Sequence, residues 1–468
     1  MATPRIGLLS LYLALYDKAL PDIRPQMEAF YAAMAEALTG CGLAVETAPV
    51  CRLRSEVSAA VSDFEAGGVD ALVTLHLAYS PSLEAAEVLA GTSLPLIILD
   101  TTPDYGFGPD RHPDAIMYNH GIHGVQDLCN LLIRHGKAFH IEAGHWERSD
   151  VLDRIVSRAQ SARMAAAMRT ARAGRLGDPF PGMGDFVVPP ETLQSTLGVV
   201  TVPADPAALH AYLPGPDDMA VAAELAADGR RFDSRGVDSE ALTDAVRTGL
   251  ALRRWLEAER LAALTINFLA CNRASGLSTM PFLEIGKAMA RGIGYAGEGD
   301  VLTAALMGAL CSVYPRTTFT EMFCPDWAEE RIFLSHMGEV NVDLLDGKAV
   351  LAEKPFPWTD VRDSVCPTGC LQGGRAVLVN LAPGPEEEYT LILAPVEMIA
   401  GGEPDLLRDT VHGWCRPAQS IDKFLAAYSH LGGTHHCVLV YDADLKALTG
   451  FGELMGWQVR ILAAEAGA

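Results

Sequence analysis

The sequence has no long apolar run. No segment reaches the ~18 consecutive apolar residues that a membrane-spanning helix requires. The apolar stretch at residues 6–16 is closed by Asp17 and Lys18, and no small-residue cleavage site follows it. We therefore expect a buried first strand there, and neither a signal peptide nor a membrane partner.

Basic residues and paired cysteines are also scarce. The 36 Lys and Arg residues face 59 Asp and Glu residues, which gives a formal net charge of -23 at pH 7. A surface of that sign repels phosphate backbones, so we expect no nucleic-acid partner. Cys366 and Cys370 are the one close pair among ten scattered cysteines, and a single pair does not make a zinc site. Scattered free thiols predict a protein of the reducing cytoplasm.

Several catalytic motifs are missing as well. The chain has no P-loop, no G-x-S-x-G nucleophile elbow and no H-E-x-x-H pair. The glycines at positions 294, 297 and 299 resemble a dinucleotide-binding loop. However, the pattern predicts a helix directly before them, at residues 283–291, where that loop requires a strand. We therefore reject a dinucleotide site.

The chain alternates apolar strands and amphipathic helices over its first ~140 residues, which predicts a parallel sheet. A glycine- and proline-rich segment at 174–190 marks a boundary, and a second helical region leads to the apolar run 263–269. Beyond residue 316 the pattern becomes β-rich, which predicts a barrel or a sandwich. The expected fold is therefore α/β throughout the first two regions, with a β domain at the end.

Four polar side chains stand in apolar or glycine-rich surroundings. Glu298 lies in YAGEGD and Glu321 in TFTEMF, while His336 lies in IFLSHMGE and His436 in LGGTHHCVLV. Two carboxylates and two imidazoles suit an octahedral site for Mn²⁺ or a similar ion. Each residue also has an ordinary explanation, because a glutamate can serve a helix dipole and a histidine at a strand end can be a hydrogen-bonded core residue.

These segments together resemble the L-arabinose isomerase family. The runs GYAGEGDVLTAALMGAL, TFTEMF, LSHMGEV and LGGTHHCVL occur in that family's order and at similar intervals. MYNHGIHG is similar to the family's N-Q-T-A-H-G loop, and RLGDPFPGMGDF is similar to its Arg-Gly-Met stretch. The resemblance implies two open α/β domains, residues 1–172 and 173–315, followed by a C-terminal β-barrel, residues 316–468. It also implies a metal-dependent aldose–ketose isomerase that works through a cis-enediol.

The resemblance assigns roles to individual residues. Glu298, Glu321, His336 and His436 would bind Mn²⁺, or another divalent cation such as Co²⁺ or Mg²⁺, and the two glutamates would carry the proton between C1 and C2. Substrate contacts are implied for Tyr12, His120, His123, Met183, Asn267 and Phe268. Asp300, Glu339 and His435 would support the ligands from outside the coordination sphere, although Asp300 can equally cap the helix expected at 302–310. The family implies a homo-oligomer, a hexamer with active sites between subunits.

The chain departs from the family at residues expected to line the pocket. His120 replaces a glutamine, Val301-Leu302 replaces Trp-Lys, and Met322-Phe323 replaces Asp-Tyr. The metal-binding residue types are retained while their expected surroundings become less polar, which favours a sugar other than L-arabinose. The alternatives are an L-fucose-type deoxysugar isomerase or epimerase and, in another class, a non-catalytic sugar-binding or regulatory protein.

Overall fold

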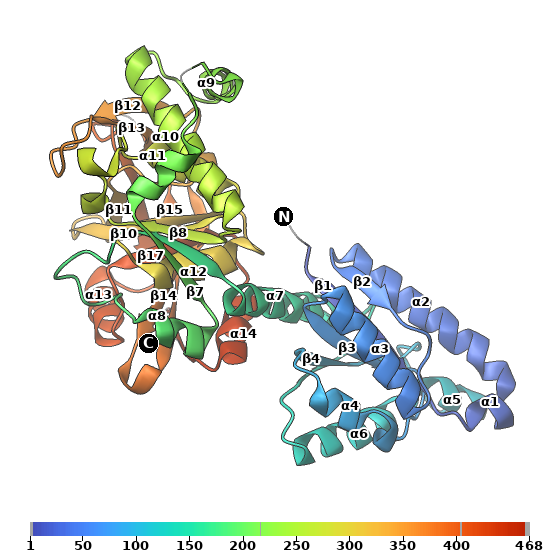
Figure 1. Ribbon diagram of the computed structural model, residues 1–468. Coiled ribbons are helices and arrows are strands. Elements are labelled where there is room, and N and C mark those ends of the chain that lie inside the picture. Colours follow the sequence, from blue (N-terminus) through green and yellow to red (C-terminus); the bar gives the residue numbers. More distant parts are fainter. Residues whose placement is uncertain (1–2, 216, 403–404, 464–468) are drawn as a thin grey trace. The chain divides into compact units, whose positions relative to one another are not determined.

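The computed structural model describes residues 3–215, 217–402 and 405–463. The chain divides into two compact units, one ending at Arg163 and the other beginning at Met164 (Figure 1). The division falls inside helix α7 (Val151–Arg169), a few residues before the predicted boundary at residue 172. The three-domain division stays a prediction.

The first unit is built on a five-stranded parallel sheet in the order β2-β1-β3-β4-β5. Apolar side chains on one face of this sheet, such as Leu9, Leu72 and Ile98, pack against helices α3, α4 and α6. Its strands are β1 (Arg5–Leu11), β2 (Ala44–Thr47), β3 (Ala71–His76), β4 (Leu96–Asp100) and β5 (His140–Ala143). Its helices before α7 are α1 (Tyr16–Ala19), α2 (Arg24–Gly40), α3 (Arg54–Gly67), α4 (Ala86–Gly91), α5 (Ile116–Asn119) and α6 (Ile122–Arg134).

The second unit begins with a four-stranded parallel sheet in the order β7-β6-β8-β9. Its strands are β6 (Arg172–Leu176), β7 (Val200–Ala204), β8 (Ala263–Ile266) and β9 (Gly294–Gly297). The accompanying helices are α8 (Pro190–Thr192), α9 (Met219–Arg231), α10 (Ser239–Ala258), α11 (Phe282–Ala290) and α12 (Val301–Cys311). The two parallel sheets confirm the predicted α/β class.

A nine-stranded mixed sheet follows in the same unit, in the order β12-β13-β16-β11-β10-β17-β14-β15-β18. Because β15 also pairs with β16, the pairings from β16 through β11, β10, β17, β14 and β15 return to β16. This is the connectivity that a closed barrel requires, while the barrel itself stays a prediction. The strands are β10 (Thr317–Asp326), β11 (Arg331–His336), β12 (Val350–Lys354), β13 (Ser364–Cys370), β14 (Gly374–Pro383), β15 (Tyr389–Ile399), β16 (Val411–Pro417), β17 (His436–Tyr441) and β18 (Gln458–Ile461). The helices are α13 (Ile421–His430) and α14 (Leu445–Met455).

Strand β9 corrects one sequence expectation. Two of the glycines predicted to follow a helix directly, Gly294 and Gly297, begin and end a strand of their own. Gly294 also lets α12 approach closely, since a Cβ at this position would fall 2.2 Å from the carbonyl oxygen of Ala304. A strand, a turn and a helix are therefore present after all. The turn still offers no phosphate cradle, because the N–H groups of Glu298, Gly299 and Asp300 all donate to acceptors within the protein.

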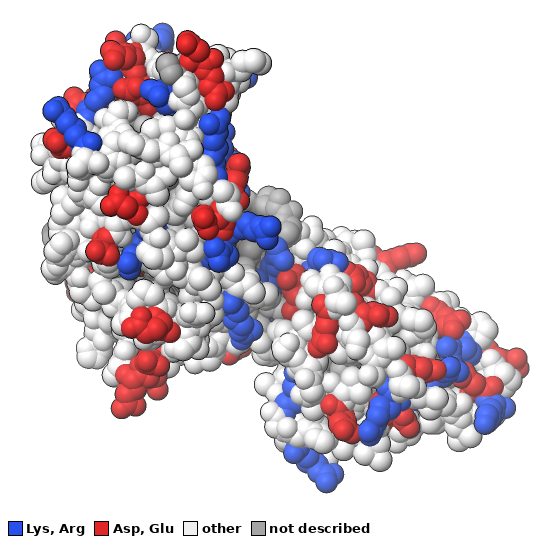
Figure 2. Space-filling view, in the orientation of Figure 1, with Lys and Arg blue, Asp and Glu red and all other residues white. Residues whose placement is uncertain are grey.

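The surface carries charges of both signs. Figure 2 shows acidic and basic side chains interspersed over the visible face. Among the helices in the described ranges, none has the length and apolarity needed to cross a membrane. The ten cysteines are free thiols, and eight of them are buried.

Candidate metal centre

Four side chains singled out in the sequence meet within the second unit. Glu298 lies in the turn between β9 and α12, Glu321 lies in β10, His336 ends β11 and His436 begins β17. Strand β10 lies between β11 and β17, so Glu321 is paired with Ser335 on one side and with His436 on the other. The strand register thus brings residues that are more than a hundred positions apart to one point.

Glu298 reaches this point through an unusual backbone conformation. Its φ is 63°, in the left-handed region, and Gly299 follows with a φ of 91°. A side chain in that region costs roughly 1–2 kcal/mol. The conformation is held by two hydrogen bonds, because the Glu298 N–H donates to the Ile266 carbonyl at 2.9 Å and its carbonyl accepts from Phe180 N at 2.8 Å. Backbone strain at a residue whose carboxylate faces other potential metal ligands is typical of a functional site.

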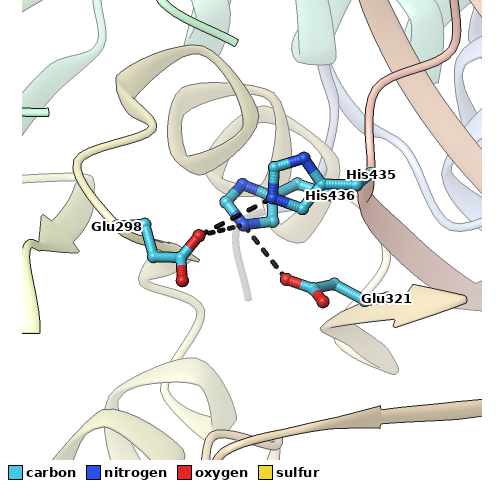
Figure 3. Close-up of side chains that lie close together, drawn as sticks. All are labelled: Glu298, Glu321, His435 and His436. Carbon is cyan, nitrogen blue, oxygen red and sulfur yellow. Dashed lines mark ion pairs between the residues drawn. The ribbon is translucent and has the colours of Figure 1, made fainter. Parts of the chain in front are cut away.

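The donor atoms lie at short range (Figure 3). His436 Nε2 lies 3.2 Å from Glu321 Oε1 and 3.5 Å from Glu298 Oε2. His336 Nε2, outside the view of that figure, lies 3.2 Å from Glu321 Oε1. His435, predicted to stand outside the coordination sphere, places its Nε2 3.6 Å from Glu298 Oε2. Donor atoms of Glu298, Glu321, His435 and His436 lie within 4.8 Å of one another. The structure therefore places a third imidazole, that of His435, beside the predicted ligands. His336 is not part of this group of four and contacts Glu321.

The two buried imidazoles are oriented by carboxylates behind them. His336 Nδ1 donates to Glu339 Oε2 at 2.6 Å, and His436 Nδ1 donates to Asp300 Oδ2 at 2.8 Å. An ionised carboxylate only accepts, so each Nδ1 carries the proton and each Nε2 is left facing the cluster. Asp300 performs both functions considered for it, because its other oxygen accepts from Thr303 N at 2.8 Å and caps α12.

Three aromatic residues that the sequence did not single out support this arrangement. Tyr295 donates its hydroxyl proton to Glu339 Oε1 at 2.8 Å. Phe186 stacks on the His436 ring at a centroid distance of 5.0 Å, and Phe319 meets the same ring edge-on at 5.0 Å. Buried aromatic residues are ordinary core components, so nothing in their sequence context marked them.

The donor set fits a divalent cation. Within the described ranges, His436 Nε2 and Glu298 Oε2 are buried and have no hydrogen-bond partner. Glu298 and Glu321 both face the His436 ring, and two more carboxylates lie behind the imidazoles, Asp300 behind His436 and Glu339 behind His336. Buried lone pairs and an excess of negative charge are stabilised by a cation that accepts oxygen and nitrogen ligands.

Protons occupy the imidazole nitrogens that face the cluster when no cation is bound. Burial lowers the pKa of His336, but the charges of Glu339 and Glu321 outweigh burial and raise it to about 10. Burial likewise opposes the shift at His436, whose pKa is raised well above its usual value by Asp300 and both glutamates. The pKa of Glu298 falls to about 2 despite its burial, because His435 and His436 stabilise its charge. Cation binding must therefore displace protons from the imidazoles.

Three predicted substrate residues belong to the first unit. The Tyr12 hydroxyl is buried without a hydrogen-bond partner among the described residues. His120 Nε2 and the Tyr16 hydroxyl lie 3.0 Å apart, and the His120 and His123 rings are 5.9 Å apart. These residues form one cluster with one another, and their contact with a substrate stays a prediction.

The other three predicted substrate residues lie in the second unit. Asn267 is 6% exposed, and its amide donates to the Asp178 carbonyl at 2.7 Å and accepts from Leu269 N at 3.0 Å. This amide is thus committed to shaping the loop after β8. Phe268 packs among other aromatic rings, and Met183 is half-buried in the loop after β6. Their contact with a sugar stays a prediction.

Comparison with known proteins gives consistent matches. The L-arabinose isomerase central domain matches residues 224–314, and the L-arabinose isomerase C-terminal domain matches residues 316–458, which together make up half of the chain. An L-arabinose isomerase of Nocardioides sp. is 28% identical over 371 residues, covering 75% of this chain and 72% of the relative. An L-arabinose isomerase of Halalkalibacterium halodurans is 23% identical over 428 residues, covering 87% of this chain and 83% of the relative. The chain therefore belongs to the L-arabinose isomerase family and is a sugar isomerase, an intramolecular oxidoreductase that interconverts an aldose and a ketose.

Proposed function

We propose that this enzyme isomerises its sugar with the help of one divalent cation and through a cis-enediol intermediate. The observation that carries the proposal is the convergence of Glu298, Glu321, His336 and His436, with Asp300 and Glu339 fixing the two imidazoles. A protein that only bound a sugar would gain nothing from two neighbouring carboxylates that repel each other, since burying charged groups is costly. The non-catalytic alternative is therefore disfavoured.

A bound divalent cation supplies Lewis-acid polarisation of the sugar oxygens at C1 and C2. The chain supplies the proton transfer: one carboxylate of the Glu298–Glu321 pair removes the proton from C2 of the aldose, and the pair returns it to C1. The O2 proton passes to O1, so no atom is lost. His336 and His436 hold the site together, because their protonated Nδ1 atoms are anchored and their rings cannot turn away.

We propose Mn²⁺ as the cation, with Co²⁺ or Mg²⁺ as substitutes. Carboxylate oxygens suit hard ions, and imidazoles extend the choice to first-row transition metals. A softer, thiolate-seeking ion is disfavoured, because the donors at this centre are oxygen and nitrogen.

We propose a substrate other than L-arabinose, and the structure changes the basis for this proposal. Val301 and Leu302, expected to line the pocket, are 5% and 1% exposed and belong to the hydrophobic core. Their replacement of polar residues therefore alters the core beneath α12. Phe323, in contrast, is 48% exposed on β10, two residues beyond Glu321, and His120 pairs with Tyr16 in the first unit. These residues support a less polar sugar, such as a 6-deoxyhexose.

A panel of aldoses tests the activity and the specificity together. L-arabinose, D-arabinose, D-galactose and L-fucose are incubated with the Mn²⁺-loaded enzyme, and ketose formation gives kcat/KM for each. We expect the highest kcat/KM for a 6-deoxyhexose or for another sugar other than L-arabinose. We expect removal of the metal with EDTA to abolish turnover. Efficient conversion of L-arabinose would overturn the proposed specificity, and undiminished turnover in EDTA would overturn the metal dependence.

Glu321→Gln tests the proton transfer. An amide cannot accept the C2 proton, so we expect kcat to fall by at least ~1,000-fold on the best sugar of the panel. Glu240→Gln is the matched control, because this glutamate lies at the exposed start of α10 and its side chain is 76% exposed. Turnover of Glu321→Gln at the level of the control would remove Glu321 from the mechanism.

A further inference from the structure

The third histidine at the centre has a partner that lies 250 positions away in the sequence. Asp185 Oδ2 accepts two hydrogen bonds from His435, one from the backbone N–H at 2.9 Å and one from Nδ1 at 2.7 Å. Asp185 comes from the loop between β6 and α8, whereas His435 immediately precedes β17. One carboxylate oxygen therefore fixes both the backbone and the ring of this histidine.

His435 differs from the other two imidazoles in its exposure. The side chain of His435 is 38% exposed, compared with 5% for His336 and 0% for His436. It therefore lies on the side of the donor cluster that solvent reaches. A sugar must approach the centre from a side that solvent reaches, because the rest of the cluster is enclosed by protein.

The contacts of His435 leave one ring atom free to act. With Nδ1 committed to Asp185, Nε2 is the remaining polar atom, and it lies 3.6 Å from Glu298 Oε2 (Figure 3). The ring packs against two tilted neighbours, His436 at a centroid distance of 4.2 Å and Phe186 at 5.7 Å. The imidazole is thus oriented toward the carboxylate that we assign to proton transfer.

We propose that Asp185 is a positioning residue, which holds His435 with Nε2 directed at Glu298 and at a sugar bound beside it. This proposal rests on the proposed function. An imidazole on an open surface can turn over and exchange its two nitrogens, and a carboxylate on Nδ1 selects one orientation. Loss of such a partner typically lowers activity by 10–100-fold.

The competing explanation is an ordinary surface ion pair. The Asp185 side chain is 39% exposed, and an exposed pair contributes little to stability. A surface pair predicts no change in turnover when Asp185 is removed. The two explanations therefore separate in the kinetics.

A double-mutant cycle makes the test. Asp185→Ala, His435→Ala and the double variant are compared with the wild type by kcat/KM on the best aldose of the panel. We expect Asp185→Ala to lose 10–100-fold and to cause no further loss once His435 is alanine, because Asp185 acts through that ring. Asp185→Asn should recover part of the loss, since its amide oxygen still accepts a hydrogen bond. Additive losses in the cycle would overturn the proposal.

Asp178→Asn is the matched control in the same loop, because the Asp178 side chain is 93% exposed and bonds to Arg175. We expect it to leave kcat/KM unchanged. Binding of Mn²⁺, measured by calorimetry, should be altered less than threefold by Asp185→Ala, since Asp185 orients His435 and supplies no ligand. A larger loss of metal affinity would show that Asp185 maintains the metal centre itself, which contradicts the proposal.

One measurement does not depend on turnover. The ring ¹⁵N signals of His435, assigned by their loss in His435→Gln, should shift in metal-free Asp185→Asn while those of His336 and His436 stay in place. Unchanged His435 signals would overturn the proposal. If the wild type converts no aldose of the panel, the proposed function fails, and this spectrum still decides whether Asp185 orients His435.

Discussion

At the scale of single residues, the turn that carries Glu298 is built at a cost to stability. Glu298 has a φ of 63°. Glycine adopts such a conformation without steric cost, and asparagine or aspartate adopts it more readily than other residues. A glycine here would remove the strain and also the carboxylate. A glutamate at this position is accounted for by the proton transfer that we propose for its carboxylate.

We predict that metal-free Glu298→Gly is more stable than metal-free Glu298→Ala by about 1 kcal/mol. Both variants lose the carboxylate, so the comparison isolates the left-handed backbone. The usual order is the reverse, since glycine costs more conformational entropy than alanine on folding. Urea denaturation of the two variants measures the difference, and a more stable alanine variant would show that the turn is not strained.

At the scale of elements, a buried network of charges joins three helices of the second unit. Lys287 of α11 is 4% exposed on its side chain and contacts Glu224 and Asp228 of α9 at 2.7 and 2.9 Å. Arg253 of α10 contacts Glu224 at 2.6 Å and Glu284 of α11 at 2.7 Å. Removing one member leaves buried charges of the other sign without a partner, which is why such networks are sensitive to single substitutions.

We predict that Lys287→Met lowers the free energy of unfolding by 3–5 kcal/mol. Methionine nearly matches the volume of lysine, so the loss reports the Asp228 carboxylate without its lysine partner and Glu224 left with Arg253 alone. Arg235→Met is the control, because the Arg235 side chain is 90% exposed and its pair with Asp233 should contribute little to stability. Equal stability of the two variants in urea would argue that the network contributes nothing.

At the scale of the whole molecule, the candidate metal centre lies where the two sheets of the second unit meet. Glu298 comes from the end of the parallel sheet, and the remaining donors come from the mixed sheet or from the residue just before it. A ligand bound at that junction stabilises the native unit, because the unfolded chain does not bring the donors together.

We predict that Mn²⁺ raises the melting temperature of this unit. At a free concentration of a hundred times the dissociation constant, binding adds about 2.7 kcal/mol. His436→Gln is the comparison, because its side chain is fully buried and supplies one donor. Differential scanning calorimetry with and without Mn²⁺ measures both proteins. An equal increase in the melting temperature of the variant would show that Mn²⁺ binds at another site. No increase in the wild type would show that the protein does not bind Mn²⁺.

We propose that the chain works as a homo-oligomer, a hexamer by resemblance, in which His123 of one subunit serves the centre of another. His123→Ala and Glu321→Gln should each be inactive. Mixed subunits should regain activity, because some hybrid sites receive an intact His123 and an intact Glu321. Size-exclusion chromatography with light scattering checks the assembly. Absence of complementation after demonstrated subunit exchange would place each site within one subunit.

The sequence by itself determined the class of elements and singled out the candidate donor residues. Strand and helix periods are local properties, so the alternation of the first unit and the α12 helix could be predicted. The donors stood out because a carboxylate or an imidazole in an apolar strand is costly unless it has a partner. Glu298, Glu321, His336 and His436 were singled out on this ground and assigned to a metal by the family resemblance. The structure links them through ion-pair distances, and their role as ligands stays a prediction.

Only the tertiary structure decided how these donors are supported. Asp185 meets His435 across 250 positions, and Tyr295 meets Glu339 across 44, and neither pairing has a local signature. The burial of Val301 was likewise decided by packing, because the same residue type could face a pocket or a core. Contacts between distant segments depend on strand register and helix approach, which are properties of the packed chain and not of any short stretch of it.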